Sequence, residues 1–523
     1  MKYLTLFTIG PVQSFIAKAR KLQDLYAGSF LLSHLTKQTM LKAQKEGATI
    51  LFPNPELESA PNRFLLTIDH ESTDSLREFC ETLDRFVREE WENLAKTVFA
   101  ELKLNYSDAA KTQIESLLQV YYASEPYLSG EEYGDCYINV IKRLGIAKML
   151  RDFVQLDEEP GRKCNVMHDY NALFSRKRQN FLVADSQIVT TDNIPSYKLD
   201  KYIESDETLS APALVKRCLV YALPDKFNDS FPSVTQIFEM YGRKLGEDDD
   251  RQGYYAVLIF DGDDMGVWYS KPDLHDSKKA ETEIFQAILS NKISEFAAEK
   301  SRKIVDWDQG QNGIVIYAGG EDFLGALNIA SVFSTLKQLR ETFGEINLTD
   351  YTDKTLKFSA GVIIAHVKTP LSEVLKMAHA AEHKAKSHPG KDAYCITIAK
   401  RSGETTEFVL PFTSSGSSTL DSFDRLAEII DKEELSPKFI YQLGIELERI
   451  ATTENEVLQK KVFLTEAKRL LNNSDMSDKE KKAKLVKESY EILEKLTDIS
   501  NTQNILMYLQ AVAFIARERG YAS

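Results

Sequence analysis

The sequence predicts a multidomain α+β protein with two mixed units, a small middle module and an all-helical C-terminal domain. Its 523 residues exceed what one hydrophobic core organises. Similar strand and helix patterns recur in two separate stretches, and from about residue 416 leucines and isoleucines fall three or four positions apart, which is a helical spacing. Hydrophobic residues make up 43% and charged residues 28%, which is typical of a folded protein.

The first unit is predicted from apolar periodicity and β-branched content over residues 1–106. Its expected elements are, in order, a strand at 3–9, a helix from Gly10-Pro11 to about Leu35, two strands at 50–52 and 64–68, and a helix at 75–100. This βα…ββα order is that of a ferredoxin-like domain. Residues 107–155 are predicted to be mostly helical. Residues 156–235 hold turn formers and no long periodic run, so we expect a middle module over 107–235.

The second unit, predicted over residues 236–412, has a clearer βαββαβ pattern. Its expected elements are a strand at 254–260, a helix at about 280–305, strands at 313–318 and 323–329, a helix at 330–343, a strand at 356–366, a helix at 371–387 and a strand at 393–399. Residues 413–523 are predicted to form an all-helical domain, with a polar break at 472–481 that separates helices.

Charge and composition exclude several classes of protein. The formal net charge of −14 disfavours a protein that binds nucleic acid over its whole surface. It permits a subunit that docks on basic partners, or an enzyme with locally concentrated positive charge. No apolar run approaches ~20 residues, and the N-terminus lacks a small-residue cleavage site. The five scattered cysteines do not form a disulfide framework, so we expect a cytoplasmic protein.

Two acidic clusters in the second unit carry the strongest chemical signal. The first, at the end of a buried strand, contains Asp261, Asp263 and Asp264; the second lies between two apolar strands and reads Gly319, Gly320, Glu321 and Asp322. Glycines permit a tight hairpin, whose acidic tip would face the end of the first strand. Mg²⁺ prefers a few carboxylates plus substrate phosphates, and two such ions ~4 Å apart can assist displacement at phosphorus.

A less specific interpretation is that the hairpin merely exposes solvated acids. The second cluster at the end of a buried strand favours a cation site instead. Further along, Lys384, Lys386 and Lys391 lie near the end of a predicted helix. They form either a solvated helix face or, beside a carboxylate–metal site, a set of point charges for nucleotide phosphates.

The sequence also resembles a known family. The GGED hairpin with its upstream acids is similar to the GGDD motif of palm nucleotide cyclases, which are related to the GGDEF type. GPVQSFIAKARKLQDLYAGSFLLSHL (10–35) strongly resembles the opening helix of the first palm in large subunits of type III-B (Cmr-type) CRISPR complexes. Further similar segments follow in the same order: PNRF (61–64), EEPGRKC (158–164), LVKRC (214–218), SAGVIIAHVKTPL (359–371) and AKRSGE (399–404).

This resemblance implies an RNA-guided complex with other Cmr-type subunits, guide RNA and target RNA. In such subunits two palms bind two nucleotides face to face and join ATP into cyclic oligoadenylates. The implied catalytic residues are Asp261, Glu321 and Asp322, and the implied ligands of Mg²⁺ or Mn²⁺ are these three and Asp263. Gly319 and Gly320 would shape the donor site; Gly28, Ser29, Asn62 and Arg63 would line the acceptor pocket; Lys386 and Lys391 would contact phosphates.

Three departures from the family pattern modify these expectations. The sequence starts at the first palm, and His168-Asp169 and His275-Asp276 lack surrounding His-rich helices, so no HD-type DNase is expected. In the middle module Cys164 remains, but Met167 and Ser210 stand where further cysteines would lie. Cys164 and His168 together would supply two ligands, whereas a structural zinc site needs four. The module is therefore expected to be a degenerate zinc ribbon without zinc.

The third departure is GGED in place of GGDD, which leaves the product open. Some related subunits without an HD domain use S-adenosylmethionine as the acceptor and make an AMP conjugate. Asp69 is a candidate ligand for that acceptor, although a strand-end acid needs no such role. Two other possibilities stay open. A catalytically inactive structural subunit has no reason to keep the acids together, and a free-standing GGDEF-like cyclase leaves residues 1–235 unexplained.

Overall fold

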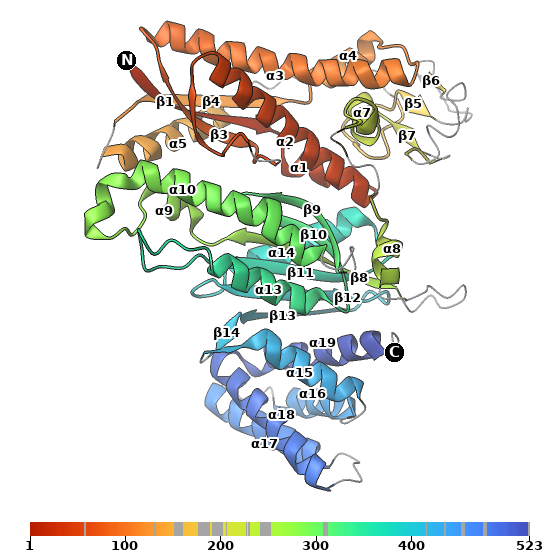
Figure 1. Cartoon of the computed structure of the whole chain (residues 1–523). Helices are drawn as coiled ribbons and strands as arrows, with labels where there is room; N and C mark the ends of the chain where they lie inside the picture. Colours follow the sequence, from red (N-terminus) through yellow and green to blue (C-terminus); the bar gives the residue numbers. More distant parts are fainter. Residues whose placement is uncertain are drawn as a thin grey trace.

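A computed structural model gives the arrangement of the chain (Figure 1). It describes residues 1–520 apart from 57–58, 129–131, 151–160, 176–188, 191–201, 205–206, 226, 228–230, 241–252, 307–311, 415, 433–435, 451–454 and 474–478. Residues 474–478 of the predicted polar break at 472–481, and parts of the predicted middle module, therefore lie outside the described residues. The first palm lies above the second in Figure 1, and the C-terminal helices lie below both.

The first palm is a four-stranded sheet in the order β2-β3-β1-β4. Its strands are β1 (Lys2–Gly10), β2 (Thr49–Phe52), β3 (Arg63–Asp69) and β4 (Gln119–Pro126). The helices around it are α1 (Gln13–Ala17), α2 (Leu22–Lys45), α3 (Thr73–Glu101), α4 (Asp108–Glu115) and α5 (Tyr133–Met149). Phe7 and Phe64 on one face pack with α2 and α3, whereas Leu4 and Leu6 on the other face pack with α5.

The structure differs from the expectation for this region in two respects. Residues 107–155 are mostly helical, in α4 and α5, but they also contain an unpredicted strand, β4, which pairs with β1 from Tyr3 to Gly10 and completes the first sheet beyond residue 106. This strand was missed because most of its residues are only partly buried, so no clear apolar alternation marks it. The helix predicted to Leu35 is interrupted between α1 and α2 and then continues to Lys45.

The middle module holds a small sheet in the order β6-β5-β7 and a short helix. Its elements are β5 (Phe174–Ser175), β6 (Val189–Thr190), β7 (Thr208–Leu209), α7 (Ala211–Arg217) and the 3₁₀ turn η3 (Leu219–Tyr221). Helix α7 is fully buried against α2, α3 and α4. The described part of the module therefore packs on the back of the first palm. Helix α8 (Val234–Glu239) leads into the second palm.

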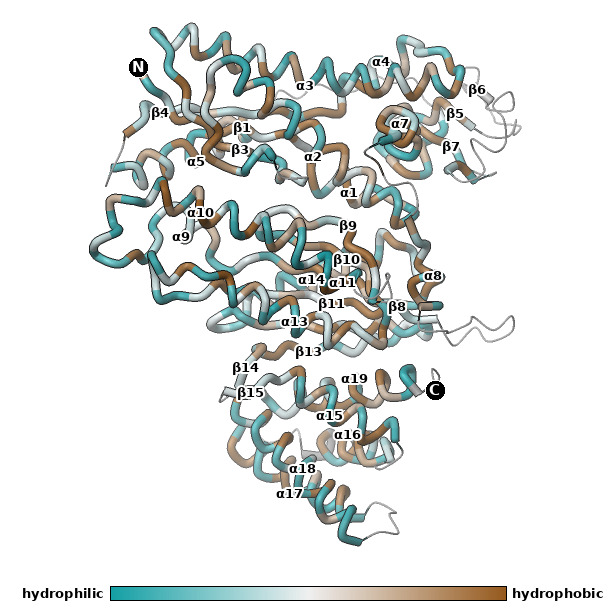
Figure 2. The backbone as a smooth tube through the Cα atoms, in the orientation of Figure 1, coloured by the Kyte–Doolittle hydropathy of each residue, from teal (hydrophilic) through white to brown (hydrophobic). Residues whose placement is uncertain are grey.

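The second palm is a six-stranded sheet in the order β13-β12-β11-β8-β10-β9. Its strands are β8 (Tyr254–Gly262), β9 (Gly313–Gly319), β10 (Asp322–Asn328), β11 (Phe358–His366), β12 (Ala393–Ala399) and β13 (Thr405–Pro411). Its helical elements are α9 (Met265–Ser270), η5 (Asp276–Glu281), α10 (Thr282–Glu295), η6 (Phe296–Lys300), α11 (Ser301–Val305), α13 (Val332–Gly344) and α14 (Leu371–Lys386). The predicted βαββαβ unit is confirmed, and β13 is an additional edge strand. Figure 2 shows the apolar character of its central strands.

Beyond a two-stranded hairpin, the C-terminal domain is helical, as predicted. The hairpin is β14 (Thr413–Ser414) with β15 (Ser417–Ser418), and the helices are α15 (Thr419–Asp431), α16 (Lys438–Ile450), α17 (Glu456–Asn472), α18 (Lys479–Ile499) and α19 (Thr502–Gly520). The domain packs on the second palm, where the rings of Phe333 and Phe423 stack with centroids 4.2 Å apart. Within the described part of the chain, no helix has the length and apolar character needed to cross a bilayer.

The two palms contact each other directly. The ring of Phe52 on β2 lies 5.3 Å from that of Tyr269 on α9, measured between centroids. The Tyr133 hydroxyl on α5 donates a hydrogen bond of 2.6 Å to Gln286 on α10, and both side chains are buried. These contacts set the relative position of the palms.

The packing of α14 on the second sheet depends on Gly361. A Cβ atom there would lie 2.3 Å from the Glu382 backbone nitrogen and 2.6 Å from the Ala378 carbonyl oxygen. Gly361→Ala should therefore destabilise the second palm by about 2 kcal/mol or more, measured by denaturant unfolding. The matched control is Gly145→Ala on α5, where a Cβ atom meets no neighbour within 4 Å. That change should stabilise the helix by about 0.5–1 kcal/mol. Equal stability of both variants would contradict the close approach of α14.

Candidate active site between the palms

The Gly-Gly-Glu-Asp segment forms the tight hairpin that the sequence predicted. Gly319 pairs with Asp322 across β9 and β10, which leaves Gly320 and Glu321 as a two-residue turn. Gly320 has a φ of 64°, a left-handed conformation that glycine adopts without strain. A Cβ atom at Gly319 would lie 2.5 Å from the Tyr317 hydroxyl. Gly320 is thus required by the backbone of this turn, whereas Gly319 leaves room for the Tyr317 ring.

The register of β8 and β10 places two acids side by side. Asp322 pairs with Asp261, and the adjacent Gly262 amide donates to the Glu321 carbonyl at 3.2 Å. In such a ladder the pair next to a hydrogen-bonded pair has Cα atoms only ~4.5 Å apart, with both side chains on the same face. That face is the one covered by α14.

Two cavities meet at this acidic pair. One has a volume of about 230 Å³ and the other of about 330 Å³. They share Asn62 of the first palm with Asp261, Tyr317 and Asp322 of the second. The smaller cavity is otherwise lined by α1, the start of α2, the β8–β10 strands and α14. The larger one lies between β2 and β3 of the first palm and the Gly-Gly hairpin of the second.

Two carboxyl groups at this junction have raised pKa values. Asp322 opens into the cavities, yet crowding by protein atoms raises its pKa to about 7, and the charge of Glu321 adds to that effect. Burial likewise raises the pKa of Glu382 on α14 to about 7, with smaller contributions from Asp322 and Asp263. Arg63 opposes the shift at Asp322. The site therefore concentrates negative charge that the surrounding protein only partly compensates.

Two cationic side chains approach the acids from different directions. Lys386, at the end of α14, forms an ion pair with Asp261 and lies 3.2 Å from the Glu382 carboxylate. Arg63, at the start of β3 in the first palm, lies 3.4 Å from the Glu321 carboxylate. The predicted residues Asp261, Glu321, Asp322, Lys386 and Arg63 are thus brought together, and Asn62 lies between both cavities.

Asp263, predicted as a metal ligand, and Lys391, predicted as a phosphate contact, line neither of these two cavities. The buried Asp263 carboxylate accepts 2.8 Å hydrogen bonds from the Ser359 hydroxyl and from the Asp392 backbone amide, which fixes the turn after α14. Lys391 pairs with Asp264 at 2.6 Å. Tertiary contacts at the strand end, which the sequence does not display, separate these residues from the acidic pair.

The structure also places three predicted residues of the first palm outside both cavities. Gly28 and Ser29 are buried on α2 and line neither cavity; a Cβ atom at Gly28 would lie 2.8 Å from Lys216 Cε in the middle module. Asp69 ends β3, six residues from Arg63 and hence roughly 20 Å along the strand. It pairs with Lys2 at the other end of β1 and β3, so it is not part of this site.

Three cavity residues were missed by sequence reasoning. Glu382 and His379 precede Lys386 by four and seven positions, which places all three on one face of α14. That spacing could have identified them. Lys148 on α5 lines the larger cavity, and its pKa is lowered by burial and by nearby Arg63. No local signal marks Lys148, because α5 was assigned to another module.

The donor set fits a hard divalent cation. Asp261 and Asp322 offer two adjacent carboxylates, and Mg²⁺ is usually held by one or two carboxylates plus substrate phosphates. Among the described residues, no group of three or more His, Cys, Asp or Glu side chains is arranged to hold a metal by itself. Substrate phosphates would therefore have to complete the coordination.

Comparisons with known proteins agree with this architecture. Residues 254–395 match the family model described as Cas10/Cmr2, second palm domain, and residues 4–96 match the model for the CRISPR-associated protein Cmr2, N-terminal. The CRISPR system Cmr subunit Cmr2 of Pyrococcus furiosus is 27% identical over 253 residues, which are 45% of this chain and 28% of that protein. The two matched segments are Cas10/Cmr2 domains.

Solved structures show the same fold at low sequence identity. A type III-B Cmr-beta structure bound to cognate target RNA matches with a TM-score of 0.63 and 13% identity, over 98% of this chain and 83% of that one. A Csm1-Csm4 cassette in complex with cA4 matches with a TM-score of 0.53 and 13% identity, over 98% and 70% of the respective chains. The two Cas10/Cmr2 family matches contain the acidic pair and Arg63, respectively, so the matched segments meet at the site.

The cost of ionising Asp322 should be visible in the stability of the free chain. Its carboxyl has a pKa of about 7 when folded against 3.8 as its ordinary value, so this cost grows as the pH rises from about 4 to about 7 and is constant above that. Asp322→Asn, which stays neutral, should therefore raise the melting temperature at pH 8 by on the order of 2 °C, and less at pH 5.5. Calorimetry without divalent cations measures this, with exposed Asp353→Asn as the control. An equal gain at both pH values would contradict the charge effect.

Proposed function

We propose that this chain is the large subunit of a type III CRISPR RNA-guided complex that transfers a nucleotidyl group from ATP and makes a cyclic oligoadenylate. The observation that carries the proposal is the Asp261–Asp322 pair at the junction of two cavities, each lined by both palms. Two adjoining cavities suit two nucleotides that must react with each other.

The reaction joins an acceptor hydroxyl to the α-phosphorus of ATP. The hydroxyl oxygen forms the new bond to phosphorus, the bond to the bridging oxygen breaks, and pyrophosphate leaves with that electron pair. The hydroxyl proton passes to solvent water, and a cation held by Asp261 and Asp322 would make that loss easier. Positioning of the two nucleotides between the palms supplies much of the remaining rate enhancement.

Charge compensation comes from the chain's own cations and from divalent ions. Lys386 lies beside Asp261 and can shift from that carboxylate to a substrate phosphate when a cation binds. Arg63 brings a positive charge from the first palm to the hairpin tip. Mg²⁺ or Mn²⁺ held by Asp261 and Asp322, with Glu321 beside them, would neutralise the phosphates and the leaving group.

Relatives support the product and the partners. Structures of the Csm1-Csm4 cassette contain cA4, cA3 or the linear pppApA. The Cmr-beta structure contains target RNA. We therefore expect the substrate to be ATP, and the partners to be other Cmr-type subunits, guide RNA and target RNA. The net charge of −14 fits docking on basic subunits better than direct binding of RNA over the whole surface.

An inactive structural subunit is disfavoured by the electrostatics of the site. Raised pKa values at Asp322 and Glu382 mean that their charged forms oppose folding near neutral pH. A purely architectural palm gains nothing from keeping these acids together. S-adenosylmethionine as the acceptor is an alternative outcome of the experiment below, and its candidate ligand Asp69 lies outside the site.

The decisive experiment uses the assembled complex with guide RNA, matching target RNA, Mg²⁺ and labelled ATP, with and without S-adenosylmethionine, analysed by mass spectrometry. We expect oligoadenylates from ATP alone, and their loss by at least about 100-fold in Asp322→Ala while assembly is intact. Asp353→Ala on the same palm is the control and should retain full activity. A product formed only with S-adenosylmethionine would identify that compound, instead of ATP, as the acceptor. Unchanged turnover of Asp322→Ala would refute the assignment of the site.

Cation binding should strengthen with pH. Because Asp322 and Glu382 have pKa values of about 7, protons compete with the cation below neutrality. Titration of the chain with Mn²⁺ and ATP, followed by electron paramagnetic resonance, should show affinity rising by about tenfold from pH 6 to pH 8. Asp322→Asn should remove most of that pH dependence. Affinity independent of pH in the unmodified chain would contradict the assignment.

A further inference from the structure

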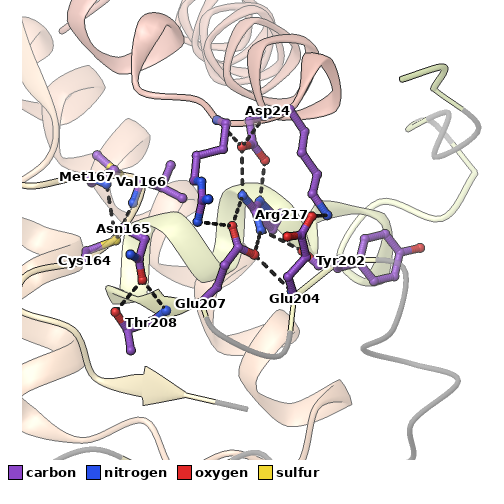
Figure 3. Close-up of polar contacts among 12 residues, drawn as sticks. Asp24, Cys164, Asn165, Val166, Met167, Tyr202, Glu204, Glu207, Thr208 and Arg217 are labelled. Carbon is purple, nitrogen blue, oxygen red and sulfur yellow. Dashed lines mark hydrogen bonds and ion pairs between the residues drawn. The ribbon is translucent and has the colours of Figure 1, made fainter. Parts of the chain in front are cut away.

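The middle module carries a buried ionic network that the proposed reaction does not use (Figure 3). We call Asp24, Glu207, Lys216 and Arg217 the latch. Arg217 at the end of α7 pairs with both Asp24 at the start of α2 and Glu207 before β7, with Nη2 distances of 3.1 and 3.0 Å. All four side chains are nearly or fully buried. Buried ion pairs seldom improve stability over apolar packing, so their retention calls for another explanation.

Lys216 holds the segment between α1 and α2. Its ammonium donates hydrogen bonds to the carbonyl oxygens of Phe15, Ile16 and Lys18, at 2.7, 3.3 and 3.0 Å. These are the carbonyls at the C-terminal end of α1, which no helix partner satisfies. Gly28 on α2 leaves the space that the lysine stem occupies. Burial lowers the pKa of Lys216 to about 7, whereas Asp24 opposes that shift.

The rest of the α1–α2 segment is tethered to the same module. The Asp24 carboxylate also accepts the backbone amides of Arg20 and Lys21, at 2.9 and 3.2 Å. At the surface, Lys21 pairs with Glu204 at 3.1 Å and Lys18 pairs with Asp169. The interior contacts are buried hydrogen bonds and ion pairs, whereas the two surface pairs are exposed and contribute little to stability.

The opposite side of this segment forms a wall of the smaller cavity. Val12, Gln13, Ile16 and Ala17 line it, and Leu25 follows from the start of α2. The middle module itself contributes no lining residue among those described between 161 and 240. Its contact with the cavity is therefore indirect, through α1.

Hydrogen bonds connect the loops within the described part of the module. Cys164 Sγ accepts the amides of Val166 and Met167 at 3.4 and 3.2 Å, and Asn165 accepts the Thr208 amide at 2.6 Å. Figure 3 shows these contacts beside Asp24, Glu207 and Arg217 of the latch. The module can therefore serve as a fixed support for α1.

We propose that the latch positions α1 as a wall of the nucleotide cavity, with Lys216 as its principal positioning residue, so that the middle module controls nucleotide binding without touching the nucleotide. The effect on nucleotides rests on the proposed function, whereas the effect on α1 does not. Lys216 donates to the backbone beside the cavity and touches no reacting atom.

The test replaces Lys216 by methionine in the full chain within the assembled complex. Loss of its hydrogen bonds should raise the KM for ATP by about tenfold and leave kcat within about twofold, because Asp261, Asp322 and Lys386 are unchanged. Hydrogen exchange of the amides of residues 13–25 should accelerate by at least about tenfold. The control Lys21→Met removes only an exposed pair and should change neither quantity.

Gly28→Ala is a second variant that keeps the lysine but crowds its stem, and it should shift KM and hydrogen exchange in the same direction. A lower melting temperature with unchanged KM and unchanged exchange at 13–25 in both variants would overturn the proposal. If the unmodified complex makes no product from ATP, the proposed function fails by itself. Binding of Mg²⁺ and α,β-methylene ATP, with the exchange of residues 13–25, then still decides whether the latch positions the wall.

Discussion

The pairing of Asp322 with Asp261 is the constraint on which the rest of the site depends. It follows from the register of β8 and β10, while the two-residue turn at Gly320 places Asp322 at the start of β10. Gly361 lets α14 lie close against the same face, and this approach brings Lys386 to Asp261. A shift of one residue in register would turn every side chain of β10 to the opposite face and separate the two carboxylates.

Placing like charges together opposes folding, and the chain offsets this only in part. Lys386 comes from the end of a helix, and Arg63 comes from the other palm. Asp322 and Glu382 nevertheless keep pKa values of about 7. Groups that oppose folding in the free chain are those that a bound cation or phosphate would stabilise. The electrostatic imbalance therefore indicates ligand binding more directly than any single contact does.

Local patterns in the sequence predicted the second palm and its acids well. The strand that ends in Asp261 and the Gly-Gly turn before Asp322 each form from a few consecutive residues, so the local sequence is enough to predict them. Gly28 was misplaced because its role depends on Lys216, which is distant in sequence and contacts it only in the folded chain. Asp263 and Lys391 lie away from the two cavities for the same reason, because their partners are distant in sequence. The strand β4 escaped detection because an edge strand with half-buried residues shows no apolar alternation.

The first palm lacks the acids, yet the site is incomplete without it. Asn62 lies between both cavities, Arg63 compensates Glu321, and α1 forms a wall. A free-standing cyclase made of the second palm alone would lose all three. The two palms are held in place by the contacts of Phe52 with Tyr269 and of Tyr133 with Gln286, at elements outside the acidic pair. Because the cavity walls belong to different parts of the chain, any partner that shifts one palm against the other changes the volume of both cavities. Control of such a site can therefore act through domain position, with no change in the side chains that line it.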